Sequence, residues 1–265
     1  MTSVPRSQLT PAPQAALLRV DDLVKSYGGV HAVAGVSFEV PRGRITGLIG
    51  PNGAGKSTAL GMIAGAIKPS HGSVLLNGTN VAGWPSYKIA RRGLARTFQQ
   101  SSEFSGMTVM ENLLTARHPQ RGDTLRGALL GRRYWRAEQD SLTALAADLI
   151  ARFDMTRMAD EFAGTLSGGQ RRLLEIMRAL MTDPEILLLD EPMSGVNPAL
   201  GARIEDYLLQ LRQDGLTMLM VEHEMAVVER VCDPIIVMAQ GEVLAEGTMD
   251  QIRSDQRVLD AYLNG

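Results

Sequence analysis

The chain has 265 residues, 45% of them hydrophobic, and 27 Lys and Arg stand against 29 Asp and Glu, for a net charge of −2. This length accommodates one large α/β domain or two small ones, and the lack of a long basic stripe excludes the footprint of a nucleic-acid partner, which counts against a protein of DNA repair or translation. Cys232 is the only cysteine, so no intramolecular disulfide is expected, and no apolar run reaches the roughly eighteen residues of a membrane span.

Two-residue alternation predicts antiparallel strands near the N-terminus. Residues 1–16 lack the apolar core of a signal peptide and are expected to form a flexible tail. The alternation runs from Leu17 to Val40 and is interrupted by a turn at Gly28-Gly29. Tyr27 ends the first strand, where it is either a platform for an adenine ring or an ordinary packing aromatic.

An apolar strand over Ile45–Ile49 leads into a glycine-rich loop and then into a helix. The loop fits G-x-x-x-x-G-K-[ST], in which the glycines let backbone N–H groups wrap around an anion. We expect Lys56 to reach the β- and γ-phosphates of a nucleotide and Ser57 to ligate Mg²⁺. Apolar residues at helical spacing from Leu60 to Ile67 predict a helix whose positive end faces those phosphates. The predicted nucleotide contacts in this loop are Gly50, Pro51, Asn52, Gly53, Ala54, Gly55, Lys56, Ser57 and Thr58.

The next part of the chain changes from strands to helices. Asn77-Gly78 is a strong hairpin signal. Between Arg96 and Asp183 the apolar spacing is helical, and we interpret this segment as an insert in the core domain. A capping box over Thr108–Glu111 starts one helix, and Leu142–Phe153 predicts another. The arginine-rich stretch 117–136 between them is a docking surface, a lipid-facing patch or a solvated basic segment.

A second glycine-containing loop opens a helix more than a hundred residues after the first loop. It comprises Ser167, Gly168, Gly169 and Gln170, and it follows Leu166. Backbone N–H groups at a helix N-terminus bind anions, so this loop is a second anion-binding element. Its distance in sequence from the first loop suggests that it acts as an external clamp on the γ-phosphate.

Two carboxylates end a strand that the sequence predicts to be buried on both faces. Ile186–Leu189 is a continuous apolar run, and Asp190 and Glu191 follow it directly. Charged groups at the carboxyl end of a central strand are typical of ligand sites in α/β sheets. We interpret Asp190 as part of the Mg²⁺ shell and Glu191 as the base or polariser for an attacking water. His223 leaves the end of another predicted core strand, Thr217–Val221, at the same kind of position.

The rest of the chain keeps the βα rhythm. Apolar spacing from Leu200 to Leu211 predicts a helix that ends at Gly215. Gln240-Gly241 predicts the turn of a last hairpin. Thr248–Gln251 is a further capping box, and it starts the C-terminal helix.

With these residues in place, the sequence resembles the ATP-binding subunits of ABC transporters from Leu17 to Gly265. The resemblance is carried by the first loop, by Thr97-Phe98-Gln99, by the signature Leu166–Gln170, by Asp190-Glu191 and by His223. It implies ATP and Mg²⁺ as ligands, with Gln99 at the metal and both Gln99 and His223 in the catalytic set. Gln100 is a neighbouring candidate, but the family pattern favours Gln99.

The resemblance also implies a fold and a domain organisation. The expected fold class is α/β, a P-loop NTPase (RecA-like) core with an antiparallel β subdomain and an inserted α-helical subdomain. Residues 17–265 then form a single ATPase domain. Within it, 17–97 hold the β subdomain and the first loop, 98–182 the helical insert with the signature, and 183–265 the rest of the core with the C-terminal helix.

Dimerisation on ATP is a further implication, with each ATP between one chain's first loop and the other chain's signature. Many members have Asp in the loop after the catalytic strand, where this chain has Asn197. This chain therefore departs from the family pattern there and carries no charge at that position.

Within the superfamily, the chain looks most like bacterial importer ATPases for branched-chain amino acids or urea. The similarity lies in the insert around Tyr134-Trp135-Arg136, in Met193–Pro198, in Glu222–Met225 and in the ending Val258–Leu263. It implies import of branched-chain amino acids or a related small polar solute. The implied partners are a second ATP-binding subunit, either a copy or a paralogue, two transmembrane permease subunits and a substrate-binding protein, at the cytoplasmic face of the inner membrane.

Three alternatives are weighed against this interpretation. The lipopolysaccharide-export ATPase is similar over the same length and stays open. Soluble ABC ATPases of translation or DNA repair carry two fused cassettes or a long coiled-coil insertion, and this chain has neither. A P-loop kinase or GTPase would leave the second glycine-rich loop unexplained, and the guanine-reading N-K-x-D element is absent from the sequence.

Overall fold

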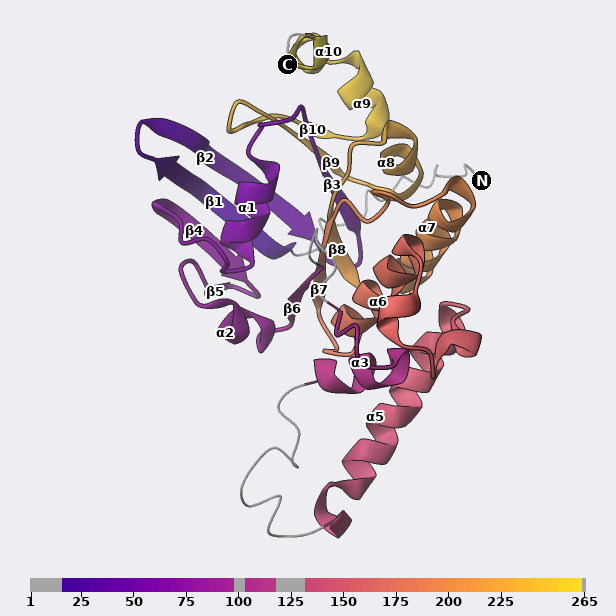
Figure 1. Cartoon of the computed structure of the whole chain (residues 1–265). Helices are drawn as coiled ribbons and strands as arrows, with labels where there is room; N and C mark the ends of the chain where they lie inside the picture. The colour runs from indigo at the N-terminus through magenta and orange to yellow at the C-terminus, as the bar shows by residue number, and fades with distance from the viewer. Residues whose placement is uncertain (1–15, 98–102, 118–131, 264–265) are drawn as a thin grey trace, which may run out of the picture.

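The chain forms two β-sheets with helices packed around them (Figure 1). The computed structural model describes residues 16–97, 103–117 and 132–263. One sheet has four strands in the order β2-β1-β4-β5, and the other has six in the order β10-β9-β3-β8-β7-β6. This is the mixed α/β architecture that the sequence predicts.

The four-stranded sheet is antiparallel and comes from the first part of the chain. Its strands are β1 (Ala16–Tyr27), β2 (Val30–Pro41), β4 (His71–Leu76) and β5 (Thr79–Asn80). The β4–β5 turn holds Asn77 at φ 49° and Gly78 at φ 72°, as a tight hairpin with two left-handed residues requires. The two hairpins predicted from Gly28-Gly29 and Asn77-Gly78 are thus confirmed.

The six-stranded sheet is parallel except for its last strand. It contains β3 (Ile45–Ile49), β6 (Leu94–Arg96), β7 (Ile186–Asp190), β8 (Thr217–Val221), β9 (Ile235–Ala239) and β10 (Glu242–Gly247), and β10 pairs with β9 in the antiparallel sense. Every residue of β3, β7 and β8 is buried. Burial on both faces explains why these strands read as unbroken apolar runs.

Two apolar clusters cover the two faces of this sheet. Leu187 and Leu189 join a cluster with the helices of the second half of the chain, and Ile186 and Leu188 join a cluster with the antiparallel sheet and α1. Successive strand residues point to opposite faces, so β7 contributes to both clusters. The sheet therefore lies in the middle, and the ends of its strands are held by packing on both sides.

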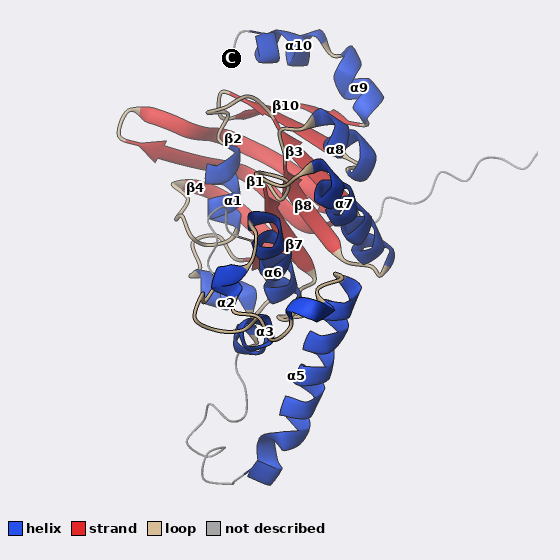
Figure 2. Ribbon diagram, turned by 45° about the vertical axis from the view of Figure 1, so that its right-hand side comes forward, coloured by secondary structure: helices blue, strands red, loops and turns tan. Residues whose placement is uncertain are grey.

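The helices are mostly short, and their bounds follow the capping signals. They are α1 (Lys56–Ile63), α2 (Ser86–Ala90), α3 (Val109–Ala116), α5 (Arg132–Arg152), α6 (Gly168–Leu180), α7 (Pro198–Gln213), α8 (Met225–Val231), α9 (Met249–Ser254) and α10 (Gln256–Leu263), with 3-10 turns at Thr156–Met158 and Ala163–Thr165. The capping boxes at Thr108 and Thr248 are both present. Figure 2 shows α5 extending away from the sheets, with α3 beside its upper part.

Three predicted helix limits are wrong. The helix after the first loop ends at Ile63, because Gly65 takes φ 72°, and Ile67 instead packs over Gly61 from a later turn. Helix α5 begins at Arg132 rather than at Leu142. The C-terminal helix is two helices, which are separated at Asp255.

Some predicted features lie outside the described residues. They include the N-terminal tail up to residue 15, Gln99, Gln100 and most of the arginine-rich stretch. Within the part of the chain that the structure describes, no helix is long and apolar enough to cross a membrane.

Candidate active site

The first loop connects β3 to α1 and is packed tightly against neighbouring backbone. Gly50 has φ 146°, and a Cβ there would overlap the carbonyl oxygen of Met238 on β9. Gly55 has φ 96°, and its Cβ would overlap the carbonyl oxygen of Ala32 on β2. Glycine is needed at both positions for conformation and for space. The loop is thus held between both sheets, with α1 starting at its end.

Lys56 closes the loop on itself. Its ammonium is buried and donates to the carbonyl oxygens of Gly50 at 2.8 Å and Pro51 at 2.9 Å. Burial lowers the pKa of Lys56, and the charges of Glu191 and Asp190 act in the opposite direction. The cation therefore lies within the loop, where an anion would be bound.

Asp190 ends β7 with one oxygen paired and one free. It is 1% exposed, and Arg96 on β6 donates to its Oδ2 at 2.8 Å. Its backbone N–H points to the hydroxyl of Thr97 at 3.4 Å. Oδ1 is buried and has no hydrogen-bond partner among the described residues. An unsatisfied buried carboxylate oxygen is costly unless a donor or cation meets it, so this atom fits a hard cation such as Mg²⁺.

Of the two other expected metal ligands, the structure describes Ser57 but not Gln99. Ser57, in the first turn of α1, is exposed, so its hydroxyl is open to a ligand. Gln99 lies outside the described residues, two positions after Thr97. No cluster of three His, Cys, Asp or Glu side chains that could hold a metal is found in the described ranges. A Mg²⁺ ion here would rely on Ser57, Asp190 and the oxygens of phosphate and water, as it does where proteins offer few carboxylates.

Glu191 and His223 meet at the same edge of the sheet. Nε2 of His223 lies 2.6 Å from Oε1 of Glu191. The backbone of Glu191 turns sharply at φ 49°, and its N–H donates to the carbonyl oxygen of Val221 on β8 at 3.0 Å. Adjacent parallel strands end together, which is why residues far apart in sequence come into contact. Two side chains that the sequence places in the catalytic set are therefore brought together.

Glu222 is a buried acid for which the sequence indicates no role. It is 4% exposed, and its two oxygens accept backbone N–H groups from Met193 at 2.9 Å and His223 at 3.1 Å. Burial raises the pKa of Glu222, and the charge of Glu191 adds to the effect. The signal that singled out Asp190, a carboxylate directly after a buried strand, is present at Glu222 as well.

The signature loop caps α6 on a different part of the surface. Ser167 accepts from the N–H of Gln170 at 3.3 Å, and Gln170 accepts from the N–H of Ser167 at 2.8 Å. Ser167 and Gly168 are exposed, whereas Gly169 is packed against Leu200. Ser167 and Gln170 line a cavity of about 330 Å³ to which no residue of the first loop contributes. Within the described chain, the signature and the first loop are therefore separate elements.

Two further residues lie at the edges of the site. Tyr27 is 52% exposed, and the Lys25 ammonium is 5.0 Å from its ring centre, so Tyr27 is not a buried packing residue.

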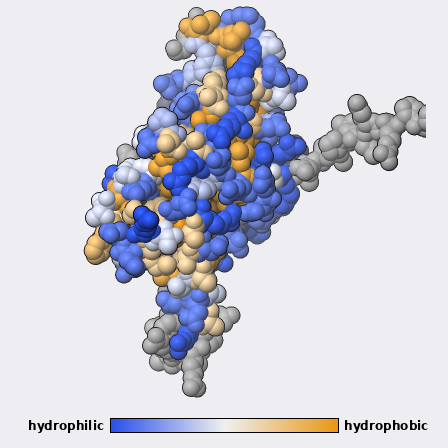
Figure 3. Space-filling view, turned by 90° about the vertical axis from the view of Figure 1, so that its right-hand side faces the viewer, coloured by the Kyte–Doolittle hydropathy of each residue, from blue (hydrophilic) through white to orange (hydrophobic). Residues whose placement is uncertain are grey.

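Tyr262 on α10 reaches the first loop. Burial raises its pKa to about 12, and a hydrogen bond with the backbone of Gly50 acts in the opposite direction. Apolar side chains of α10 gather at the top of the molecule (Figure 3), where Leu263 is 81% exposed.

The fold and the strand-end carboxylates beside a glycine-rich loop define a nucleotide hydrolase of the P-loop class. The sequence model described as ABC transporter matches residues 33–194, and the model described as Branched-chain amino acid ATP-binding cassette transporter matches residues 242–263. The chain belongs to the ABC transporter family, and it is an ATP-binding subunit that couples ATP hydrolysis to transport.

Relatives match over almost the whole chain. BraF of Pseudomonas aeruginosa, a high-affinity branched-chain amino acid transport ATP-binding protein, is 39% identical over 248 residues, which is 93% of this chain and 97% of BraF. LivG of Escherichia coli K12, which carries the same description, is 41% identical over 248 residues, 93% of this chain and 97% of LivG.

Solved structures agree with the fold. An ATP-binding cassette of an ABC transporter in its ADP conformation has a TM-score of 0.81 and 33% identity, covering 95% of this chain and 100% of that chain. A dimeric cassette in a post-hydrolysis state, bound to ADP and Pi, has a TM-score of 0.74 and 25% identity, covering 88% of this chain and 98% of that chain.

Proposed function

We propose that this ATPase drives the import of branched-chain amino acids or a related small polar solute. The support is the C-terminal match over residues 242–263 and the descriptions of BraF and LivG. We propose further that it works with two transmembrane permease subunits and a substrate-binding protein, and that these permeases hold it at the cytoplasmic face of the inner membrane.

The observation that carries the proposed chemistry is the 2.6 Å contact of Glu191 with His223 beside the unsatisfied Oδ1 of Asp190. Lys56 releases the two loop carbonyls and binds the β- and γ-phosphates. Ser57, Asp190 and Gln99 would hold Mg²⁺, which would neutralise charge on the phosphates. Glu191 accepts a proton from the attacking water, and His223 fixes the orientation of that carboxylate.

A dimer completes each site in this proposal. Ser167 is exposed at the N-terminus of α6, away from the first loop of its own chain. Its hydroxyl and the N–H of Gly169 then act on the γ-phosphate held by the partner chain. The dimeric form of a related cassette supports this arrangement, and two-fold symmetry makes it reciprocal. Tyr27, half exposed at the end of β1, is the proposed platform for the adenine ring.

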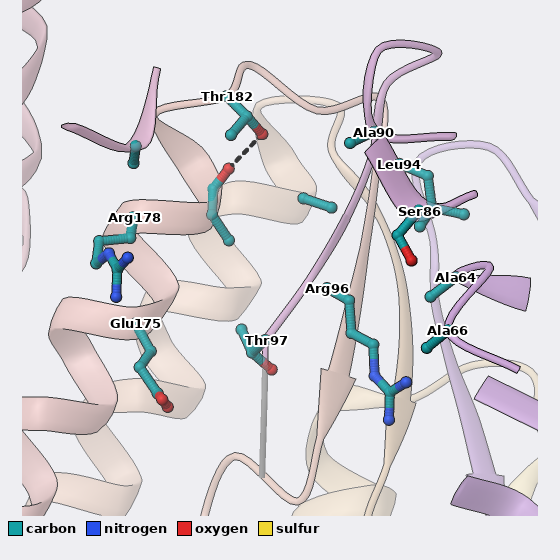
Figure 4. A pocket seen from close by; sticks show the side chains of 13 residues that line it. Ala64, Ala66, Ser86, Ala90, Leu94, Arg96, Thr97, Glu175, Arg178 and Thr182 are labelled. Carbon is teal, nitrogen blue, oxygen red and sulfur yellow. Dashed lines mark hydrogen bonds between the residues drawn. The ribbon is translucent and has the colours of Figure 1, made fainter. Parts of the chain in front are cut away.

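A cavity of about 280 Å³ beside α6 is the proposed docking point of a permease segment (Figure 4). The apolar side chains of Ala64, Ala90 and Leu94 lie on one side of it, with Arg96 of β6 on the same side. Two charged residues of α6, Glu175 and Arg178, lie on the opposite side. Such a lining suits a short amphipathic segment. A segment seated there would touch both Thr97, which leads to Gln99, and α6, which carries the signature.

Uptake measurements test the proposed cargo. A strain that lacks this gene should lose ATP-dependent uptake of leucine, isoleucine and valine, and the intact gene should restore it. The matched control is Lys56→Ala, which should express to the same level without restoring uptake. If leucine uptake is normal in the deletion strain while urea uptake or lipopolysaccharide export fails, the cargo proposal is wrong.

A variant in the cavity tests the docking point. Ala90→Arg places a long side chain at an exposed helix end that lines the cavity, and it leaves the first loop untouched. It should abolish recovery of the chain with detergent-solubilised permeases while the ATPase rate of the isolated chain is unchanged. Lys88→Ala, on the same helix but outside the cavity lining, should bind normally. Normal recovery of Ala90→Arg would exclude this cavity.

A further inference from the structure

Glu222 extends the connection between two strands past the point where their backbone pairing ends. The last backbone contact between the two strand ends is the N–H of Glu191 donating to Val221 at 3.0 Å. One residue after Val221, the Glu222 side chain connects the two segments in place of backbone pairing. Its Oε1 accepts from the N–H of Met193, and its Oε2 accepts from the N–H of His223. A single side chain thus joins the segment that follows Glu191 to the segment that carries His223.

The Glu222 carboxylate is in an unfavourable environment for a charge. It is 4% exposed, and Glu191, another acid, lies near enough to act on it electrostatically. The facing titratable groups are Glu191, His223 and Cys232. Two backbone N–H donors facing two oxygens are satisfied by the ionised carboxylate, because both oxygens must accept. An aliphatic residue at this position would avoid the burial of charge but would leave both N–H groups without an acceptor.

These two hydrogen bonds hold the segments of Glu191 and His223, and the proposed chemistry depends on both residues. Glu191 is at φ 49°, a conformation in which it needs support from its surroundings. His223 must stay within 2.6 Å of it. We infer that Glu222 is a positioning residue for ATP hydrolysis, which acts by holding the Glu191 and His223 segments in register. This inference rests on the proposed role of Glu191.

The test compares Glu222→Gln with a matched buried acid. Glutamine keeps the length of the side chain but offers one acceptor oxygen for two N–H groups, so one contact is lost. Because a misplacement of about 1 Å can cost about 100-fold in rate, kcat should fall about 10- to 100-fold while the KM for ATP stays within about twofold. The control is Glu205→Gln. Glu205 on α7 is 8% exposed and pairs at 3.0 Å with Arg230 of α8, which is not one of the proposed site residues. It should lose thermal stability without loss of kcat.

A double-variant cycle separates positioning from a general loss of structure. If Glu222 acts through Glu191, adding Glu222→Gln to Glu191→Gln should lower the residual single-turnover rate no further. Normal kcat in Glu222→Gln, a raised KM at unchanged kcat, or additive losses in the double variant would each overturn the inference. Normal hydrolysis by Glu191→Gln alone would instead overturn the proposed role of Glu191, so the two failures are distinguishable.

Discussion

Arg172, in the second turn of the signature helix α6, donates to the backbone carbonyl oxygen of Glu191 at 3.2 Å. The same guanidinium donates to the Glu175 carboxylate at 2.9 Å, and both side chains are buried. One side chain therefore connects the helix that Ser167 caps to the residue that we propose as the base. In the proposed dimer, Ser167 serves the partner's ATP and Glu191 its own, so this contact links the two sites within one chain.

Arg172→Lys should separate the two contacts. Lysine keeps a positive charge near Glu175, but a single ammonium does not reproduce the two-pronged geometry of the guanidinium. We expect most of the thermal stability to remain and the ATPase rate to fall. Arg172→Met, which removes the charge, should lose about 3 kcal/mol of unfolding free energy in urea titrations. An Arg172→Lys protein that hydrolyses ATP at the normal rate would show that the Glu191 contact is dispensable.

Glu191→Gln should bind ATP normally and lose most of its turnover. The loop and Lys56 are untouched, whereas the group that accepts the proton is neutral. General-base catalysis typically contributes about 10²–10⁴-fold, so the steady-state rate of phosphate release should fall by that factor. Nucleotide affinity is measured on the same protein by titration calorimetry. Lys56→Ala is the contrasting variant and should weaken the affinity itself.

Gly50→Ala should disrupt the first loop because its methyl group would overlap the Met238 carbonyl. Gly53→Ala is the matched control. It lies in the same loop at φ 78°, but no atom lies within 4 Å of its added Cβ. Both variants carry backbone strain, so the difference in unfolding free energy between them measures the overlap, and it should exceed about 1 kcal/mol. Equal stabilities would mean that β9 moves away from the loop at little cost.

Asn197 has a structural role that does not need a charge. It caps α7, and its Oδ1 accepts from the N–H of Leu200 at 3.0 Å. Asn197→Asp should retain the cap and the melting temperature, since both residues are good N-caps. Asn197→Ala should lose about 1 kcal/mol. A change in ATPase rate in Asn197→Asp without a change in stability would reveal a role for charge at this position.

The positions of the proposed catalytic groups were predictable from the sequence, because buried strands and the polar residues after them produce a strong pattern. Asp190, Glu191 and His223 each follow a run that is apolar on both faces, and such strands end at one edge of the sheet. The roles of Arg172 and Glu222 were not predictable. Each depends on which backbone atom lies opposite a side chain, and that is decided by packing between segments far apart in sequence.

The limits of the helices were less predictable than their existence. Periodicity continues from Leu60 through Ile67, but a left-handed turn at Gly65 ends α1, and Ile67 fills the space over Gly61 from outside the helix. Apolar spacing alone does not distinguish a residue within a helix from one that folds back onto it. The β-hairpins were predicted well, since Asn-Gly and Gly-Gly specify turns locally.

The central proposal is that one chain's first loop holds ATP while the other chain's signature acts on its γ-phosphate. The most direct test mixes two chains that both carry Glu191→Gln, one with Lys56→Ala and the other with Ser167→Arg. In the proposed dimer both lesions fall in one composite site and leave the other site whole, so the mixed dimer should trap one ATP per pair. Trapping of no ATP in the mixed dimer, while Glu191→Gln alone traps two, would show that each signature serves its own chain's nucleotide and would contradict the proposal.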